Sequence, residues 1–522
     1  MSEAPHRDPA RAPVYGQKLV AVTGHSLASL AAVRIFERGG NLADAAIAAS
    51  AVTAVVLHHA AGIGGDAFLL YREGRSGRVY GLNASGTAPA LATPEHFANG
   101  IAPHGPCASV TPGLVAAWDA LHRRFGRLPW RRLFEAALEA AAGHVISDVA
   151  AERSAAEADQ LTDPGCAALY LPDGHPLSRG SIVRQPALFA TLREIASLGA
   201  EAFYRGVIAE NIAAFFEAHG GLMRASDLAD YHPVWSDSLT TEYRRHIVHV
   251  MPPNSCGPLL LLQLDGISAV KPQSLADSAL LRIACQMSAM RAAFAAGVPL
   301  IADPASVPNA VEQLLSSEMK ARMRAAVLAG ESSARTPDSG GTSCLVLADA
   351  EGNAISLVQS IFNVFGAMLL DPATGILFNN RMHGFSTDPR SANVVAPGKR
   401  VSHTLCPVLV ERDGKLRFAM ATPGGLSQTL TNMQVLSHLV DCGMNVQQAV
   451  EAPRWCNTRR GDFLLEQSFP ADFPVRLSER GHRAERRDDG YFYGSAKVVE
   501  VLASGAIAGG ADFRREGFAL GC

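Results

Sequence analysis

The chain of 522 residues is longer than one hydrophobic core usually supports, so the sequence predicts several packed layers or two domains. Hydrophobic residues make up 48% and charged residues 18%, a globular composition that excludes a disordered or collagen-like chain. The net charge of −3 excludes an overall field that attracts nucleic acid or anionic lipid, although local basic pockets stay open.

Cysteine usage and the N-terminus both favour a soluble, cytoplasmic protein. The nine cysteines are scattered, odd in number and free of a C-x-x-C pair, which is typical of reduced, mostly buried thiols. The same spacing lacks the paired ligands of a structural zinc site, so neither a metal nor another cofactor is expected. Residues 1–17 begin polar and proline-rich without the apolar core of a signal peptide, and they are predicted to form a flexible tail. The longest apolar stretch, 45–57, is too short to span a bilayer.

The first three fifths of the chain are predicted to be mostly helical, with short strands near the start. Strands are expected at 19–23, 68–72 and 79–82, and helices at 26–38 and 41–57. Paired glycines end the first helix, and Asn41 caps the second. Ala-rich amphipathic runs dominate from about 112 to 309, interrupted by a strand at 243–251, and a further helix follows at 312–328.

A polar, breaker-rich loop over 329–341 separates this region from a run of strong strands. It ends at two glycines, and a strand is predicted to begin directly after them. The strands expected beyond this point lie at 342–349, 354–361, 407–411, 417–421 and 496–502, with a helix at 426–441. Because strands and helices segregate rather than alternate, the sequence favours an α+β fold over a doubly wound sheet.

Two glycine-bounded turns in the first part of the chain are weak candidates for a reaction centre. Residues 24–28, GHSLA, follow a strand and precede a helix as a nucleophile elbow does, but they lack the second glycine, and a helix cap at Ser26 is favoured. Residues 62–66, GIGGD, come after a helix and before a strand, the reverse of a phosphate-binding loop. The adjacent His58 and His59 point in different directions on a helix, which disfavours a shared metal.

Thr342 is a candidate nucleophile at the junction of the loop and the strand. A threonine hydroxyl reacts poorly without an adjacent base, but an N-terminal threonine carries one in its α-amino group, whose pKa lies near neutrality. That arrangement requires the bond between Gly341 and Thr342 to be cut, and Gly341, which has no Cβ, lets the Thr342 hydroxyl approach its carbonyl. Taken alone, the motif also fits an ordinary strand threonine.

A second candidate feature is the TPGG run at 422–425, where a predicted strand ends and a helix begins. The backbone N–H groups of Gly424 and Gly425 are then free and point at one spot, as an oxyanion hole requires. A plain strand-to-helix turn is the alternative.

Together, these segments resemble the gamma-glutamyltranspeptidase family of N-terminal nucleophile hydrolases, from about residue 18 to residue 510. The matching stretches follow the family's order: GGNLADAAIAASAV (39–52), GIGGDAFLLY (62–71), VTPGLVAAWDALHRRFG (110–126), MPPNSCG (251–257), GGTSCLVLADAEGNAISLVQS (340–360), FGAMLLDPATGILFNN (365–380), PGKR (397–400), TPGG (422–425) and MNVQQAVEAPR (444–454). The resemblance implies a four-layer αββα sandwich. It also implies a chain that cuts itself before Thr342 into a large, mostly helical subunit, 18–341, and a small one, 342–522.

The same resemblance implies roles for single residues. Thr342 is the implied nucleophile with its amine as base, Gly424 and Gly425 form the oxyanion hole, and Ser360 matches a second hydroxyl near the amine. The two subunits would remain together as a heterodimer, alone or as a dimer of heterodimers. Such an enzyme acts on a small molecule, with no cofactor, nucleic acid or membrane partner.

The residues that match the family's glutamyl-binding set depart from its pattern. The family's arginine, Gln, Asp, serine pair and asparagine are replaced in turn by Ser85, Arg381, Gly384, His403 with Thr404, and Phe362. A γ-glutamyl group carries an α-carboxylate and an α-ammonium. Gly384 removes the anion for the ammonium, and Arg381 supplies a cation that can hold a bare carboxylate in a bidentate pair. Phe362 would also narrow the pocket.

These exchanges predict an amidohydrolase for a small amide that carries a carboxylate and no amine. The pattern resembles the oxamate amidohydrolase branch, which converts oxamate to oxalate and ammonia and would serve purine or allantoin nitrogen catabolism. Three alternatives stay open: gamma-glutamyl transfer or hydrolysis on glutathione-like substrates, another small amide or acylated substrate, and an unprocessed, non-catalytic binding protein on the same fold.

Overall fold

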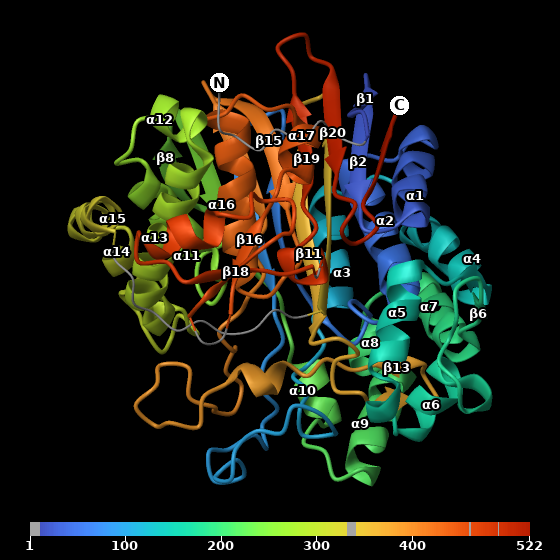
Figure 1. The fold of residues 1–522 in the computed structure, drawn as a ribbon. Coiled ribbons are helices and arrows are strands. Elements are labelled where there is room, and N and C mark those ends of the chain that lie inside the picture. The colour runs from blue at the N-terminus through green and yellow to red at the C-terminus, as the bar shows by residue number, and fades with distance from the viewer. Residues whose placement is uncertain (1–10, 331–340, 459–460, 489) are drawn as a thin grey trace.

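Two antiparallel sheets lie face to face in the middle of the protein, and helices cover both outer faces (Figure 1). The computed structural model describes residues 11–330, 341–458, 461–488 and 490–522. Sheet I contains, in spatial order, β1 (Val14–Gly16), β20 (Ile507–Ala511), β19 (Lys497–Val501), β15 (Lys415–Ala421), β14 (Val408–Arg412), β9 (His246–Val250) and β8 (Leu239–Tyr243). Sheet II contains β21 (Phe518–Gly521), β2 (Leu19–Thr23), β10 (Gly341–Asp349), β11 (Ala354–Phe362), β3 (Asp66–Arg72), β4 (Val79–Ala84) and β7 (Val234–Asp237).

The helices divide into two groups, one on each outer face (Figure 1). Those that pack with sheet II are α1 (Ser26–Glu37), α2 (Leu42–Val56), α3 (Leu114–Phe125), α4 (Glu135–Ala142), α7 (Pro186–Leu198), α8 (Glu201–Arg205), α9 (Val207–Ala218) and α10 (Ala225–Ala229). Those that pack with sheet I are α11 (Gly257–Ile267), α12 (Pro272–Asp277), α13 (Ala279–Gly297), α14 (Ala310–Leu314), α15 (Ser317–Ala329), α16 (Ser427–Val440), α17 (Val446–Glu451) and α18 (Phe473–Ser478). The predicted α+β, αββα sandwich is confirmed.

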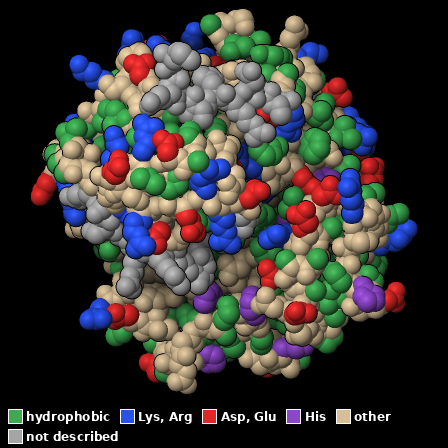
Figure 2. All heavy atoms as spheres, viewed as in Figure 1, with side chains coloured by type: hydrophobic (Ala, Val, Ile, Leu, Met, Phe, Trp, Pro, Cys, Tyr) green, Lys and Arg blue, Asp and Glu red, His purple; other side chains and the backbone are tan. Residues whose placement is uncertain are grey.

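Smaller elements complete the chain. Helices α5 (Asp148–Ala156) and α6 (Pro164–Tyr170) pack around a separate apolar cluster with Phe365. The short strands pair as β5 (His144–Val145) with β6 (Ile182–Val183), β12 (Leu370–Asp371) with β13 (Ile376–Leu377), and β16 (Trp455–Asn457) with β17 (Phe463–Leu465) and β18 (Ala484–Arg486). On the face shown in Figure 2, acidic and basic side chains are interspersed, in keeping with the small net charge.

Three apolar layers hold the sandwich together, because every central strand is covered on both faces. Leu345 and Leu347 of β10 pack under α1 and α2, whereas Cys344 and Val346 point into the layer between the sheets. This alternation follows from the two-residue period of a strand. It places Thr342 at the end of the row of β10 side chains that faces sheet I.

Helix α2 shows how local signals build the core beneath sheet II. Its N-cap Asn41 accepts from the Asp44 backbone N–H, and Asp44 accepts from the Asn41 backbone N–H, which completes a capping box. All of its residues are buried, as expected for a helix that is apolar on every side. Its Ser50 hydroxyl donates to Gln359 of β11, one residue before Ser360, so α2 and β11 are held in register.

Several sequence predictions differ from the structure. Val14–Gly16, within the expected flexible tail, form β1 and pair with β20, so the tail prediction is wrong for these residues; residues 1–10 lie outside the described part. The strand expected at 243–251 is instead half of a hairpin, β8–β9, that turns at Arg244 and Arg245 with positive φ. Local composition does not show such pairings, because they depend on partners elsewhere in the chain or on turn geometry.

Two helix boundaries also differ. The helix predicted over 312–328 is broken into α14 and α15, because the Ser316 side chain caps a new N-terminus. The favoured cap at Ser26 is wrong: the His25 ring accepts from the Leu27 N–H, and Ser26 is the first residue of α1. Most of the loop predicted over 329–341 lies outside the described residues.

One helix meets the length and composition of a membrane span. It is the stretch Ala279–Leu300, formed by α13 and a following 3₁₀ turn. However, 72% of its apolar window is buried inside the protein, where it contributes to the core under sheet I. This burial is typical of the core helix of a large domain.

Each of the two sheets contains strands of both predicted subunits. In sheet II, β10 and β11 of the predicted small subunit lie between β2 and β3 of the large one. In sheet I, β14 pairs with β9 in the same manner. The division at Gly341–Thr342 itself stays a prediction.

Gly65 brings β3 close to the reactive end of β11. A Cβ at this position would overlap the backbone carbonyl of Ser360, whereas one at Gly62 would meet its nearest neighbour at 3.7 Å. Ser360 pairs with Asp66 in the register of these strands, so Gly65 permits the close approach that places both residues.

We expect Gly65→Ala to push β3 from β11 and to lower the free energy of unfolding by about 1–3 kcal/mol, the usual effect of overpacking. Gly62→Ala is the matched control and should change stability little. Urea unfolding of both variants tests the statement, and equal midpoints for Gly65→Ala and Gly62→Ala would contradict it.

Candidate active site

Thr342 and Ser360 form a hydrogen-bonded group around the carbonyl of Gly341. Ser360 Oγ donates to the Gly341 carbonyl oxygen at 2.7 Å and lies 3.2 Å from Thr342 Oγ1. The Phe362 N–H donates to the same Ser360 hydroxyl at 2.8 Å. Because a hydroxyl has one proton to donate, Ser360 accepts from Thr342 while it polarises the carbonyl. Thr342 is only 4% exposed, so the group is shielded from water.

The backbone geometry at this point requires a glycine. Gly341 pairs with Phe362, and the register of β10 against β11 shifts between Gly341 and Ser343, as at a β-bulge. A Cβ on Gly341 would lie 2.9 Å from the Val364 backbone nitrogen. Phe362 itself has a φ of +79°, which is rare for a bulky residue and typical of functional sites.

The TPGG turn joins β15 to α16 and carries two glycines with positive φ, +131° at Gly424 and +59° at Gly425. Their carbonyls accept from Ser427 and Gln428 at the start of the helix. In the described part of the chain, the N–H groups of these two glycines donate to no other group. Pro423 and Thr342 line one small cavity of about 20 Å³, so the turn lies beside the candidate nucleophile. The arrangement is compatible with an oxyanion hole.

A buried charged group, which we call the Asp66 cluster, consists of Asp66, Arg381 and His403. Arg381 donates from Nε to Asp66 Oδ2 and from Nη2 to Asp66 Oδ1, both at 3.1 Å. His403 Nε2 donates to Asp66 Oδ2 at 2.7 Å. All three residues are fully buried, and Asp66 is the strand partner of Ser360, so the cluster adjoins the Thr342 group.

The charges in this cluster compensate each other. Burial alone would raise the pKa of Asp66, but Arg381 and His403 hold it below its usual value. Burial and the nearby Arg381 lower the pKa of His403 to about 4, so this imidazole is neutral at pH 7. One cation and one anion remain, and the cluster is neutral overall.

The presence of Asp66 corrects the charge assignment made from sequence. The sequence analysis predicted a pocket that had lost its anion, but the GIGGD segment supplies one, and Arg381 is paired with it. The sequence held one signal for this anion: a carboxylate, Asp66, directly precedes the apolar run 67–71. A carboxylate buried in this way needs a charged partner. The Arg381 edge at Nη1 is less engaged, since its neighbour Thr404 Oγ1 lies 3.5 Å away.

The other predicted binding residues lie around this cluster. The Phe362 ring packs 4.3 Å from the Arg381 guanidinium, and a Cβ on Gly384 would lie 3.9 Å from the tip of that ring. Phe362 therefore fills space beside Gly384. Ser85 is one step removed: it accepts from the Asn254 side chain, and the Asn254 carbonyl accepts from the His403 N–H.

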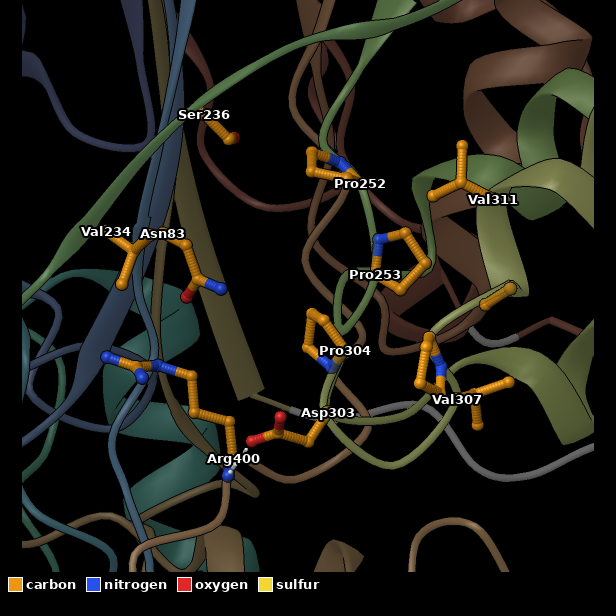
Figure 3. Close-up of a pocket in the computed structure, with 12 residues that line it drawn as sticks. Asn83, Val234, Ser236, Pro252, Pro253, Asp303, Pro304, Val307, Val311 and Arg400 are labelled. Atoms are coloured by element: carbon orange, nitrogen blue, oxygen red, sulfur yellow. Dashed lines mark hydrogen bonds between the residues drawn. The ribbon is translucent and has the colours of Figure 1, made fainter.

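A larger pocket is lined by Asn83, which is bonded to Ser85 (Figure 3). It has a volume of about 340 Å³ and is walled by prolines and valines, with Asp303 accepting from the Arg400 N–H at 2.8 Å. Asn83 accepts from the Ser85 hydroxyl and donates to Asn254, so these side chains separate the pocket from the Asp66 cluster. Thr342 does not line it.

The remaining sequence candidates do not assemble into a site. Ser26 is exposed at the start of α1. His58 and His59 are buried, and among the described residues no three His, Cys, Asp or Glu side chains come together in a way that could hold a metal ion. All nine cysteines are free.

An αββα sandwich with a threonine at the start of a central strand is the architecture of N-terminal nucleophile hydrolases. The family profile described as Gamma-glutamyltranspeptidase matches residues 28–522. The chain therefore belongs to the gamma-glutamyltranspeptidase family, and it is a hydrolase of the amidohydrolase or acylase kind.

Several relatives match over almost their whole length. The glutathione hydrolase-like YwrD proenzyme of Bacillus subtilis is 31% identical, covering 97% of this chain and 99% of its own. The oxamate amidohydrolase proenzyme of Klebsiella pneumoniae is 33% identical, with 96% and 98% covered. Among solved structures, cephalosporin acylase from Bacillus halodurans superimposes with a TM-score of 0.92 at 32% identity, with 99% and 98% covered.

We expect Asp66→Asn to lower the free energy of unfolding by about 3–5 kcal/mol, because it leaves the Arg381 charge buried without a partner. The double variant Asp66→Asn/Arg381→Gln removes both charges and should be destabilised less than the single variant. Chemical unfolding of the unmodified protein, Asp66→Asn, Arg381→Gln and the double variant measures this coupling. Additive losses would show that the two side chains do not compensate each other.

Proposed function

We propose that this protein is a self-processing amidohydrolase that cleaves a small amide bearing a carboxylate, such as oxamate, to the acid and ammonia. The observation that carries the proposal is the arrangement of Thr342, Ser360 and the Gly341 carbonyl. A nucleophile, a hydrogen-bond donor to the carbonyl and a flanking glycine lie together at one peptide bond.

Self-cleavage would begin with attack of Thr342 Oγ1 on the Gly341 carbonyl carbon. The Ser360 hydroxyl, already bonded to the carbonyl oxygen, stabilises the negative charge that develops there. The acyl group passes from nitrogen to oxygen, and water then hydrolyses the ester. The products are a carboxylate on Gly341 and a free α-amino group on Thr342.

Turnover would use the same threonine with its new amine as base. The amine takes the Oγ1 proton while the oxygen attacks the substrate amide, and the N–H groups of Gly424 and Gly425 stabilise the tetrahedral oxyanion. The proton then passes to the leaving nitrogen, which departs as ammonia. Water hydrolyses the acyl-threonine ester and returns the free hydroxyl.

The Asp66 cluster supports selection of a carboxylate over an ammonium. Arg381 and His403 donate to both Asp66 oxygens and Arg381 compensates the Asp66 charge, which makes this carboxylate a weaker partner for a substrate ammonium. The less engaged Nη1 edge of Arg381 can receive a substrate carboxylate, and the Phe362 ring restricts its size. The oxamate amidohydrolase relative supports this substrate class.

The names of two similar proteins point to two other substrate classes. The glutathione hydrolase-like relative favours a γ-glutamyl substrate, and the cephalosporin acylase structure favours a larger acyl group. Turnover of oxamate, a γ-glutamyl anilide and a glutaryl anilide by the processed protein separates the three. Preference for either anilide would contradict the proposed substrate while leaving self-processing intact.

Purified protein should run as two bands on a denaturing gel. Cleavage before Thr342 divides the 522 residues into 341 and 181, which share the mass of 55.0 kDa as roughly 36 and 19 kDa. Thr342→Ala should remain a single band, whereas the neighbouring Ser343→Ala should still be cut. A small band that begins at any residue other than Thr342 would refute the assignment of the nucleophile.

Arg381 should be required for turnover of the carboxylated amide. Arg381→Lys keeps the positive charge but loses the planar guanidinium that can bind a carboxylate with two hydrogen bonds. Asp66→Asn/Arg381→Gln removes the cation without leaving the Asp66 charge buried alone. We expect kcat/KM for oxamate to fall by about 30-fold or more in the double variant, the usual result of losing a buried charged partner. Arg400→Gln, in the neighbouring pocket, is the control. Ammonia release measures the rates, and unchanged kcat/KM in the double variant would remove Arg381 from the site.

A further inference from the structure

Two further buried cations, which do not belong to the Asp66 cluster, lie beside Thr342. The small cavity beside Thr342 and Pro423 is also lined by Lys497, Arg515 and His59. Lys497 is the β19 partner of Ala421, the last residue before the TPGG turn, and it is 1% exposed. The two cations therefore lie beside both Thr342 and the TPGG turn.

Both cations are fixed in place by neutral groups. Lys497 Nζ donates to the Ser495 carbonyl at 2.8 Å and to the Ser495 hydroxyl at 2.9 Å. Arg515 donates from Nε to the Tyr491 carbonyl at 2.9 Å, and its guanidinium stacks 3.6 Å from the Tyr491 ring. Arg515 Nη1 is buried and has no hydrogen-bond partner.

Burial lowers the pKa of both Lys497 and Arg515, and the nearby Asp512 raises both, but Asp512 forms its ion pairs with other residues. Asp512 is engaged by Arg454 and Arg514, and Arg514 also pairs with Glu466. These two acids and two arginines balance each other. Within the described ranges, neither Lys497 nor Arg515 takes part in an ion pair, so their charges remain uncompensated by direct contact.

The other titratable groups around the cavity leave a net positive charge. Burial lowers the pKa of His59 to about 3 and raises that of the Cys344 thiol to about 11, so both are neutral at pH 7. Glu516 supplies one carboxylate, which accepts from the Val149 N–H. The Arg153 guanidinium stacks on the Tyr491 ring. Among the groups that line the cavity, two cations thus face one carboxylate.

We propose that Lys497 and Arg515 keep the freed α-amino group of Thr342 neutral, so that it can act as the base. This inference rests on the proposed self-cleavage, which creates that amine. Neither cation takes part in the reaction itself; each acts on the amine through its charge.

The physical argument is that like charges oppose protonation. An α-amino group ordinarily has a pKa of about 7.7–8.0 and is mostly protonated at pH 7, when it cannot accept the Thr342 proton. Two cations that outnumber the one carboxylate of the cavity, in a site shielded from water, disfavour the ammonium form and lower the pKa of the amine by about one unit. Burying a cation without an acidic partner lowers the stability of the fold. An effect of these charges on the Thr342 amine explains why they are kept.

The amine can be titrated directly in the processed protein with cyanate, which adds only to neutral amines. Carbamylation of the small-subunit N-terminal peptide is followed by mass spectrometry from pH 5 to pH 9. We expect a midpoint below pH 7 for the unmodified protein and a rise of about one pH unit in Lys497→Met, because one cation is lost. Lys497→Arg keeps the charge and should keep the low midpoint. Lys415→Met, at the exposed start of neighbouring β15, is the matched control and should also keep it.

Arg515→Gln provides an independent variant with the same expected rise, should Lys497→Met not fold. The acid limb of kcat/KM for oxamate should move upward with the cyanate midpoint, whereas a merely structural defect would lower the rate at every pH. An ordinary amine midpoint in the unmodified protein, or equal midpoints in Lys497→Met and Lys415→Met, would overturn the inference. Because the titration needs no substrate, either result stands apart from the question of which amide is cleaved. A protein that never exposes Thr342 would instead contradict the proposed function.

Discussion

The need to neutralise a carboxylate that has no contact with water governs the reactive end of this sandwich. Asp66 begins β3, whose next five residues, 67–71, form apolar core. Its charge is tolerable only because Arg381 and His403 donate to its two oxygens. Those two residues come from distant loops, which are thereby tied to β3. Since Asp66 pairs with Ser360, the same ion pair fixes the surroundings of the candidate nucleophile.

Thr342 consequently lies between two different electrostatic environments. On the side of β11 and β3, a cation and an anion cancel, and the remaining guanidinium edge can recognise a substrate group without imposing a large field. On the side of β19, Lys497 and Arg515 line the cavity beside Thr342 and form no ion pair among the described residues. Under the proposed roles, recognition and control of the base belong to separate residues, so a change of substrate would not require a change in the chemistry of the threonine.

Local sequence patterns were sufficient to predict the central strands and the first two helices, because their apolar periods and caps are encoded within a few residues. They also singled out Thr342 and the two glycines of the turn, and the family resemblance added Ser360. The structure brings the Thr342 hydroxyl within 3.2 Å of Ser360, and their catalytic roles stay a prediction. Local patterns failed for β1, whose stability comes from pairing with β20 nearly five hundred residues later. They also failed for Asp66: the apolar run after it indicates a buried carboxylate that needs a partner, but not that this partner is Arg381. Neither long-range pairing nor ion-pair partners have a local period.

Because both sheets are built from strands of both predicted subunits, a cut before Thr342 changes how the protein can refold. An intact chain refolds at a rate independent of its concentration, but two pieces whose strands alternate in both sheets must find each other first. Neither piece alone contains a complete sheet, so separation of the pieces and loss of the fold become one event. The processed protein would then owe its lifetime to the height of its unfolding barrier, and a molecule that once opened in dilute solution would have no unimolecular way back.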